Sequence, residues 1–390
     1  MSGPDKNFWP RRAGRGAALT LVFASVLATG AVTGSWPDGG GKHVGHEERP
    51  VADVREQPLD DASRAAREAM SEGKSPQQSA QAADEAVSRS GDRWGAVYSE
   101  AEYEEFEQSL DGEYTGVGLW ARRTADGRIQ VTGVRAGSPA RAAGIRAGDR
   151  LTSVDGRPVT GRPVTEALSL LRGERAGTTV RVGLKRGTRA WIRTLRRANL
   201  STDSVAVTHP TRDTVLIKVS AFTRGTGARI AEAVRTAPAR AGVVLDLRGN
   251  SGGLVTEAVT AASAFLDGGL VATYDVRGEQ CALHAKRGGD TARPLVVLVD
   301  GGTMSAAELL TGALQDRGRA VVVGSRTFGK GSVQMPSRLP DGSVAELTVG
   351  HYRTPSGHSV DGRGITPDLE AGDRALGRAE TVLSGLGHPS

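Results

Sequence analysis

The sequence has a single cysteine, Cys281, which excludes an intramolecular disulfide and any metal site built from several cysteines. Aromatic residues make up only 4% of the chain. The uncharged apolar run from Ala17 to Val32 has 16 residues, fewer than the roughly 20 that span a bilayer comfortably. With 38% hydrophobic and 24% charged residues among 390, the chain is neither a polytopic membrane protein nor wholly disordered. Its length allows two or three domains.

Acidic residues are scarce in one stretch of the chain and abundant in another. Residues 113–200 carry 18 basic against 6 acidic side chains, or +12, whereas residues 51–112 carry 6 against 15, or −9. A total of +6 is compatible with nucleic-acid binding. Because the excess lies in one stretch, without interleaved aromatics or a nucleic-acid motif, we expect no nucleic-acid partner.

The N-terminus has the pattern of a secretory signal. Arg11, Arg12 and Arg15 precede the apolar run, which ends in small residues around Ala28-Thr29-Gly30-Ala31. We expect residues 1–34 to be a signal peptide or a retained signal anchor, which makes the protein extracytoplasmic, either secreted or anchored to the cell membrane. The residues that flank Arg11-Arg12 do not support a twin-arginine signal.

The composition changes twice between this segment and residue 112. Residues 35–58 are rich in glycine, proline and charge, which predicts a flexible linker. His43 and His46 stand there without a third ligand, so we expect solvated side chains rather than a metal site. Residues 59–112 carry apolar residues at helical spacing among many acids, which predicts a region of two or three short helices.

From Tyr114 the chain changes to short β-rich segments punctuated by glycine. The motifs are Gly116-Val117-Gly118-Leu119, Ser138-Pro139-Ala140, Ala143-Gly144-Ile145, Gly148-Asp149 and Val154-Asp155-Gly156. In this order they resemble a PDZ domain of the bacterial type, which we assign to residues 113–200. The resemblance implies that a peptide C-terminus adds as a strand, with its carboxylate held by backbone N–H groups. The implied peptide-binding residues are Gly116, Val117, Gly118, Leu119, Ala167, Leu168 and Leu171.

Strand and helix patterns alternate from residue 201 to 375, which predicts an α/β core with function at the strand ends. Apolar strands at 241–247, 295–299 and 320–323 are each followed by a break in the pattern. The breaks contain Asn250-Ser251-Gly252-Gly253, Ser305-Ala306-Ala307-Glu308 and Phe328-Gly329-Lys330-Gly331. Each alone could be structural, and Ser305 to Glu308 is a good capping box. Together we expect them to meet at one sheet edge. Residues 376–390 are assigned to a C-terminal tail.

These breaks resemble the motifs of the carboxyl-terminal processing peptidases, also called tail-specific proteases. Ser305 and Lys330 are 25 positions apart, the separation usual in that family, and Gln334 follows the lysine by four. The resemblance covers residues 60–370 and implies a multidomain α/β protease core with a helical N-terminal region and a PDZ-like β-rich module. Further matches are Asp246-Leu247-Arg248-Gly249, Thr354-Pro355-Ser356-Gly357, Gly364-Ile365-Thr366-Pro367-Asp368 and the acidic stretch Tyr103-Glu104-Glu105-Phe106.

The resemblance implies an exported serine endopeptidase that recognises unstructured protein C-termini and cleaves with a Ser305–Lys330 dyad assisted by Gln334. A lysine can accept the serine proton only when neutral, so its pKa must fall from about 10.4 to roughly 7–8. Burial among apolar neighbours lowers a lysine pKa in this way. Gln334 can orient the amine without adding a negative charge that would raise its pKa.

The negative charge that develops on the carbonyl oxygen during the reaction needs N–H donors. The resemblance implies no metal or cofactor. The Ala306 N–H is unpaired if Ser305 begins a helix, and by resemblance Gly252 or Gly253 supplies a second donor. Three residues depart from the family pattern: Asp300, Met304 and His358. Of these, Met304 could narrow the site beside the nucleophile.

Other interpretations stay open at this stage. A serine–histidine triad is the rival mechanism, but its candidate histidines lie in no supporting motif; they are His209, His284, His351 and His358. A second alternative function is a catalytically silent adaptor that only binds peptides through its PDZ domain. A third is a peptidase that acts on short peptides. The sequence predicts no oligomeric state.

Overall fold

The computed structural model describes residues 57–386 except 125, 162–163, 174, 277–278 and 373. The predicted signal segment, most of the predicted linker, and His43 and His46 lie outside the described residues. Within the described part, one compact unit is Glu113–Ser201, and a second combines the residues up to Gly112 with those from Thr202 onward. No helix of the described residues is both long and apolar enough to span a membrane.

The N-terminal region is helical, as its apolar spacing predicts. Ser75 and Gln78 form a capping box at one helix, and Ser99 and Glu102 form another, which satisfies the free N–H groups of the first turn. The elements are α1 Gln57–Ser71, α2 Pro76–Arg89, β1 Ala96–Tyr98 and α3 Glu100–Leu110.

The larger unit contains a sheet in the strand order β10-β11-β12-β15-β16-β19. Strand β10 pairs antiparallel at one edge, and the others run parallel. Its strands are β10 Val205–Thr211, β11 Thr214–Val219, β12 Gly242–Asp246, β15 Leu295–Val299, β16 Val321–Gly324 and β19 Leu369–Glu370. The helices are α6 Thr226–Thr236, α7 Val255–Ser263, α8 Ala306–Asp316 and α9 Ala375–Leu386.

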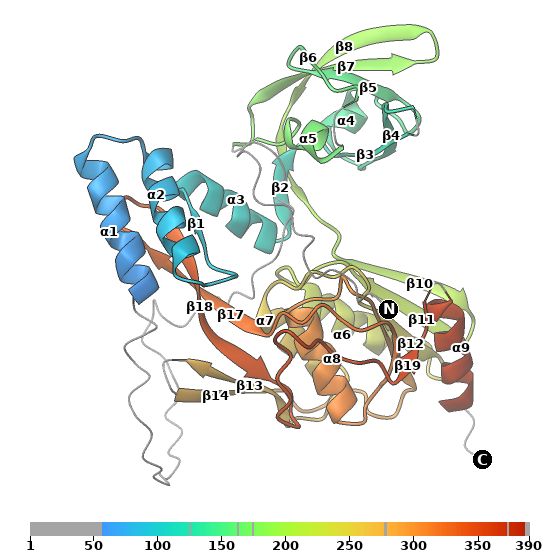
Figure 1. Cartoon of the computed structure of the whole chain (residues 1–390). Coiled ribbons are helices and arrows are strands. Elements are labelled where there is room, and N and C mark those ends of the chain that lie inside the picture. Colours follow the sequence, from blue (N-terminus) through green and yellow to red (C-terminus); the bar gives the residue numbers. More distant parts are fainter. Residues whose placement is uncertain are drawn as a thin grey trace, which may run out of the picture. The chain divides into compact units, whose positions relative to one another are not determined.

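Both faces of this sheet are covered (Figure 1). On β12, Val243 and Leu245 belong to the core formed with α6, α7 and α8, whereas Val244 packs with residues of α9. Burial on both faces explains why the strand is continuously apolar rather than alternating. The predicted tail is wrong for residues 376–386, because Ala379 and Leu383 recur at helical spacing and bury α9 against the sheet.

A second sheet of the larger unit has the order β1-β18-β13-β14, and β17 also pairs with β18. Strand β1 pairs antiparallel with β18, with Ala96 opposite Glu346, so the N-terminal region completes a sheet built by the distant C-terminal part. The strands besides β1 are β13 Leu270–Val276, β14 Glu279–His284, β17 Ser332–Arg338 and β18 Val344–Arg353.

The unit Glu113–Ser201 is a small β-rich fold with its own core, including Ile129, Leu151, Val182 and Leu184. Its main sheet has the order β3-β4-β5-β7-β8, with β6 beside β5, and β2 pairs with β9. The strands are β2 Glu113–Gly116, β3 Leu119–Arg123, β4 Ile129–Val134, β5 Arg150–Val154, β6 Arg157–Pro158, β7 Thr179–Arg186, β8 Arg189–Arg196 and β9 Ala198–Ser201. The helices are α4 Pro139–Ala142 and α5 Val164–Ser169.

The parallel sheet brings three loops to one edge. Strands β12, β15 and β16 are adjacent and parallel, so the segments that follow them leave the sheet at the same end. These segments carry Gly252, Ser305 and Lys330, and the expected meeting of the three breaks is confirmed. This edge is where ligands bind in open α/β sheets.

Candidate active site

Ser305 stands between β15 and α8 in a backbone conformation that is rare for a residue with a side chain. Its φ is 56° and its ψ is −119°, a strain of about 1–3 kcal/mol that persists only where the surroundings hold it. An N-cap side chain normally bonds the first turn from extended backbone. Ser305 is fully buried, and its Oγ makes no hydrogen bond within the described residues. The hydroxyl is therefore not occupied as a helix cap.

The carboxylate of Glu308 holds the Ser305 and Lys330 loops together. Its Oε2 accepts the backbone N–H groups of Ser305 and Lys330, each at 2.9 Å. Its Oε1 accepts the Gly329 N–H at 2.7 Å and the Thr327 hydroxyl at 2.5 Å. Burial raises the pKa of Glu308 against these hydrogen bonds. The predicted capping box is thus present in its glutamate half, and the same carboxylate fixes the lysine loop.

The Lys330 side chain is buried, with 1% of its surface exposed. Its Nζ lies 4.8 Å from the centre of the Trp94 ring, and Trp94 packs edge-on against Phe328. Burial lowers the pKa of Lys330 to about 8, against the attraction of Glu346, Asp92 and Glu308. Desolvation disfavours the ammonium because a charge loses more in leaving water than a neutral amine does. With a pKa of about 8, roughly a tenth of this amine is neutral at pH 7, far more than for an ordinary lysine.

Gln334 is fully buried on β17. Its Nε2 donates to Ser332 Oγ at 2.9 Å and to Thr348 Oγ1 at 3.2 Å. Its Oε1 has no donor within the described part of the chain. The pairing of β17 with β18 shifts register between Val333 and Gln334, and such bulges re-aim side chains beside active sites.

Two of the predicted oxyanion donors, Ala306 and Gly252, lie beside Ser305. Ala306 is the first residue of α8, where backbone N–H groups have no partner inside the helix. A Cβ on Gly252 would stand 2.9 Å from the Ser305 Cβ and 3.2 Å from the Ala306 nitrogen, and its φ is +100°. The Gly252 N–H donates to Asn250 Oδ1 at 2.9 Å. Gly253 forms an isolated β-bridge with Phe222.

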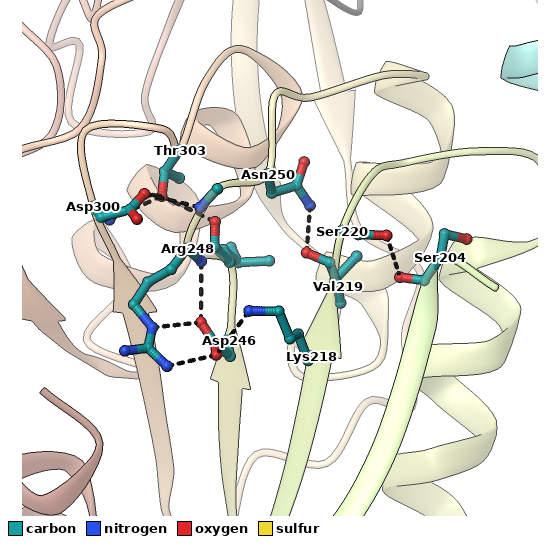
Figure 2. A network of polar contacts seen from close by, with 11 residues as sticks. Ser204, Lys218, Val219, Ser220, Asp246, Arg248, Asn250, Asp300 and Thr303 are labelled. Carbon is teal, nitrogen blue, oxygen red and sulfur yellow. Dashed lines mark hydrogen bonds and ion pairs between the residues drawn. The ribbon is translucent and has the colours of Figure 1, made fainter. Parts of the chain in front are cut away.

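A polar network fixes the loop after β12 (Figure 2). Asp246 accepts two hydrogen bonds from the Arg248 guanidinium, at 2.8 and 2.7 Å. Although burial alone would raise the pKa of Asp246, these bonds hold it below its usual value. Asp300 accepts the N–H groups of Gly249 and Gly302, each at 2.9 Å. Asp300, a departure from the family pattern, therefore joins the loop after β12 to the loop that carries Ser305.

None of the four rival histidines forms a hydrogen bond with the Ser305 hydroxyl. His209, His284, His351 and His358 are all exposed, whereas Ser305 is fully buried. His351 lies 3.8 Å from Asp361, and His358 bonds Ser356 at 2.9 Å. Met304 is nearly buried beside the serine. Among the side chains that the structure describes, no group of three or more potential metal ligands occurs.

The predicted peptide-binding residues lie at one border of the β-rich unit. Strand β3 is the terminal strand of its sheet, and α5 packs against it. Gly118 has a φ of +78°, and a Cβ there would overlap Ser138, which explains the glycine. Most of the remaining residues belong to the hydrophobic core, and Leu168 is partly buried against it; the core members are Val117, Leu119, Ala167 and Leu171.

Sequence reasoning missed four residues around the lysine: Asp92, Trp94, Glu346 and Thr348. Glu346 is 1% exposed, and neither of its carboxylate oxygens has a hydrogen-bond partner in the described part. Burial raises its pKa to about 7, and Lys330 lowers it. A glutamate inside the apolar strand 344–349 was the available signal. For Trp94 the available signal was its rarity, since the chain has only 5 tryptophans. It also follows Asp92 closely, and aspartate favours turns.

Comparison with known families adds independent findings. Residues 213–371 match the model of peptidase family S41, and residues 130–186 match that of the PDZ domain. Carboxyl-terminal-processing peptidase 3 of Arabidopsis thaliana is 37% identical over 304 residues, 73% of this chain and 58% of the relative. A CtpA-like serine protease of Staphylococcus saprophyticus is 30% identical over 375 residues, 94% of this chain and 74% of the relative.

The solved structure of a photosystem II D1 C-terminal processing protease is also similar. It has 30% sequence identity and a TM-score of 0.50, covering 80% of this chain and 86% of the other. The carboxy-terminal processing protease CtpA of Bacillus subtilis is 30% identical, over 72% of this chain and 61% of the relative. The chain spans about three fifths of the length of several of these relatives.

Proposed function

This chain belongs to peptidase family S41, the carboxyl-terminal processing proteases, and on that premise we propose a serine endopeptidase that uses Ser305, Lys330 and Gln334. The observation that carries the proposal is the pairing of a serine hydroxyl without a hydrogen bond and a buried lysine whose backbone shares one Glu308 oxygen with the serine. A pKa of about 8 makes that lysine a competent base near neutral pH.

In the proposed reaction, the neutral Lys330 amine takes the Ser305 proton as Oγ attacks the peptide carbonyl. The resulting ammonium then gives a proton to the departing amine, and an acyl-enzyme is left on Ser305. Water attacks the ester with Lys330 again as base, which releases the new C-terminus and restores the hydroxyl. Gln334 holds the amine in place through the free Oε1.

The developing oxyanion is stabilised by the Ala306 N–H and by one glycine N–H. We propose Gly253 rather than Gly252 as that donor, because the Gly252 N–H already bonds Asn250. Since Ser305 is fully buried, its surroundings must rearrange before a substrate carbonyl reaches Oγ. The PDZ unit is proposed to gate this rearrangement on binding substrate.

The proposed substrate is an unstructured protein C-terminus with an apolar end. It adds along β3, and its carboxylate meets the backbone of Gly116–Leu119. The charge of +12 over residues 113–200 favours an anionic tail. The N-terminal signal pattern supports an extracytoplasmic enzyme, secreted or anchored by residues 1–34. To test export, a reporter enzyme that is active only outside the cytoplasm is fused after residue 40. We expect the fusion to be active, and an inactive fusion would contradict export.

The test uses the purified protein beside Ser305→Ala and Lys330→Ala. Each is incubated with an unfolded protein that ends in Ala-Ala, and with the same protein carrying an amidated C-terminus. The proposal expects cleavage by the parent only, weakened by amidation. Cleavage that survives in either variant contradicts the dyad, and tight tail binding without cleavage favours the adaptor.

A second comparison tests the PDZ unit and the substrate class. The parent should cleave a folded protein with an appended tail better than free short peptides. Replacing residues 115–197 by a short flexible linker should change the rate or the choice of substrate. If the protein with the replacement cleaves the same substrates at the same rates as the parent, the PDZ unit has no gating role. If the parent prefers free peptides, the enzyme is a peptidase of short peptides and does not recognise protein tails.

A further inference from the structure

A chain of hydrogen bonds leads from Gln334 to a residue of the N-terminal region. The Thr348 hydroxyl on β18 contacts Gln334 Nε2 at 3.2 Å and Asp92 Oδ1 at 2.8 Å. Asp92 lies between α2 and β1, 256 positions away from Thr348. The proposed enzymatic function gives Asp92 and Thr348 no role.

The Asp92 carboxylate accepts four hydrogen bonds, two of them from Thr348. It accepts the backbone N–H groups of Trp94 at 3.0 Å and Gly95 at 2.9 Å. It also accepts the Thr348 N–H at 2.7 Å, in addition to the Thr348 hydroxyl. Three of these four donors bond Oδ1, and the Thr348 N–H bonds Oδ2. An ionised carboxylate can only accept, because it has no proton to donate. The Thr348 hydroxyl must therefore donate its only proton to Asp92.

This donation decides which way the Gln334 amide faces. With its proton directed to Asp92, Thr348 Oγ1 can only accept a hydrogen bond from Gln334, so the amide NH₂ group must face Thr348. Ser332 Oγ accepts from the same NH₂ group at 2.9 Å. The amide oxygen is then turned away from both hydroxyls, buried and without a donor in the described part.

We infer that Asp92 is a positioning residue that acts through Thr348 to keep the Gln334 oxygen available as an acceptor for the Lys330 amine. This rests on the proposed function of Lys330 and Gln334. The N-terminal region also supplies Trp94, whose ring faces the lysine Nζ. The Asp92–Gly95 turn therefore contributes to the lysine site in two ways.

The orientation matters because the two ends of the amide act oppositely on an amine. An oxygen facing Lys330 holds the amine through one of its protons and leaves the nitrogen lone pair directed elsewhere, toward Ser305. An NH₂ group facing Lys330 would donate to that lone pair, which blocks the base and lowers the lysine pKa. Without the Thr348 hydroxyl, the amide can take either orientation.

The experiment compares Thr348→Val, Thr348→Ser and a matched Thr208→Val, since Thr208 is exposed on β10. Valine keeps the backbone bond to Asp92 but removes the hydroxyl. We expect Thr348→Val to lower kcat about tenfold with KM nearly unchanged, and to move the acid limb of the pH profile to lower pH. Serine restores the hydroxyl, so Thr348→Ser should stay close to the parent, as should Thr208→Val.

A double-mutant cycle with Gln334→Ala separates positioning from general damage. If Thr348 acts only through Gln334, adding Thr348→Val to Gln334→Ala should change kcat less than twofold. An equal tenfold loss in both backgrounds overturns the inference, as does a parent-like kcat for Thr348→Val. Gln334→Leu replaces Gln334→Ala if thermal melting shows the latter unfolded. Activity surviving in Lys330→Ala would instead contradict the proposed function itself.

Discussion

The parallel sheet buries apolar side chains, whereas the β17–β18 hairpin buries polar and ionisable side chains among its apolar ones. Strand β15 is entirely apolar and less than 2% exposed along its length. The hairpin buries Gln334 and Glu346, and Lys330 just before it. Apolar burial stabilises a fold, whereas burial of charged groups without close partners destabilises it.

The difference shows how the two regions divide their work. The sheet supplies stability and delivers three loops to one edge, so its residues can be exchanged for others of similar shape. The hairpin and its lysine supply shifted pKa values, which require that polar groups leave water. The predictions below separate these two contributions.

Lys330→Met should give the largest effect and should move activity and stability in opposite directions. We expect peptidase activity to fall at least a thousandfold because the base is lost. Below pH 8 the folded protein carries a lysine whose pKa is about 8 instead of 10.5, so its charge opposes folding. Methionine removes that charge, and the free energy of unfolding at pH 7 should rise by about 1–2 kcal/mol.

The stability gain has a pH signature that chemical denaturation can measure. Because the pKa of Lys330 is depressed in the fold, its unfavourable contribution is full below pH 8 and disappears as pH rises toward 10.5. The advantage of the variant should shrink across that range. Lys286→Met, at an exposed lysine, should change neither quantity, and a destabilised Lys330→Met would contradict the contrast drawn here.

Leu245→Ala tests the sheet. Leu245 is fully buried in the core between β12 and the helices, so the cavity should lower the free energy of unfolding by about 2–5 kcal/mol. Activity per folded molecule should stay near that of the parent because no site residue is touched. Leu386→Ala removes the same atoms from a side chain that is 48% exposed and should cost far less in urea denaturation.

Sequence alone predicted the sheet and its loops because continuous apolar strands, glycines and a spaced serine and lysine are local patterns. Phe328-Gly329-Lys330 and Ser305 fall where the motifs placed them. Trp94 and Glu346 were missed since their role depends on pairing between β1 and β18, which lie far apart in sequence. A glutamate inside an apolar strand is a local signal, but that pattern does not identify a buried lysine as its neighbour.

Gly252→Ala tests the close approach at the nucleophile. The new Cβ would stand 2.9 Å from the Ser305 Cβ, so Ser305 and the Ala306 N–H must shift. We expect kcat to fall about tenfold to a hundredfold, the range seen when an oxyanion donor is misplaced. Gly249→Ala is the matched control, with a φ of +70° and nothing within 4 Å of the added Cβ. Equal kcat losses in both variants would mean that backbone strain, and not the contact with Ser305, causes the loss.

Glu346→Gln should give the smallest effect, on the pH profile rather than on the maximal rate. Glu346 is the strongest acidic influence on Lys330, ahead of Asp92 and Glu308. The charge of Glu346 also contributes to the raised pKa values of Tyr98 and Tyr103. Glutamine keeps the shape and removes the charge, so the pKa of Lys330 should fall and more amine should be neutral near pH 7.5.

The effect is confined to a pH window because the two groups titrate together. Below pH 6, Glu346 is protonated in the parent, as its pKa of about 7 requires, and the two proteins should have equal kcat/KM. Near pH 7.5 the ionised glutamate holds the proton on Lys330, so the variant should be about twofold faster. Well above pH 9, Lys330 is neutral in both, and the rates should converge. The rise of kcat/KM with pH should be broader than a one-proton titration curve in the parent. In the variant the rise should follow a one-proton curve. A uniform loss of activity at every pH would make Glu346 merely structural.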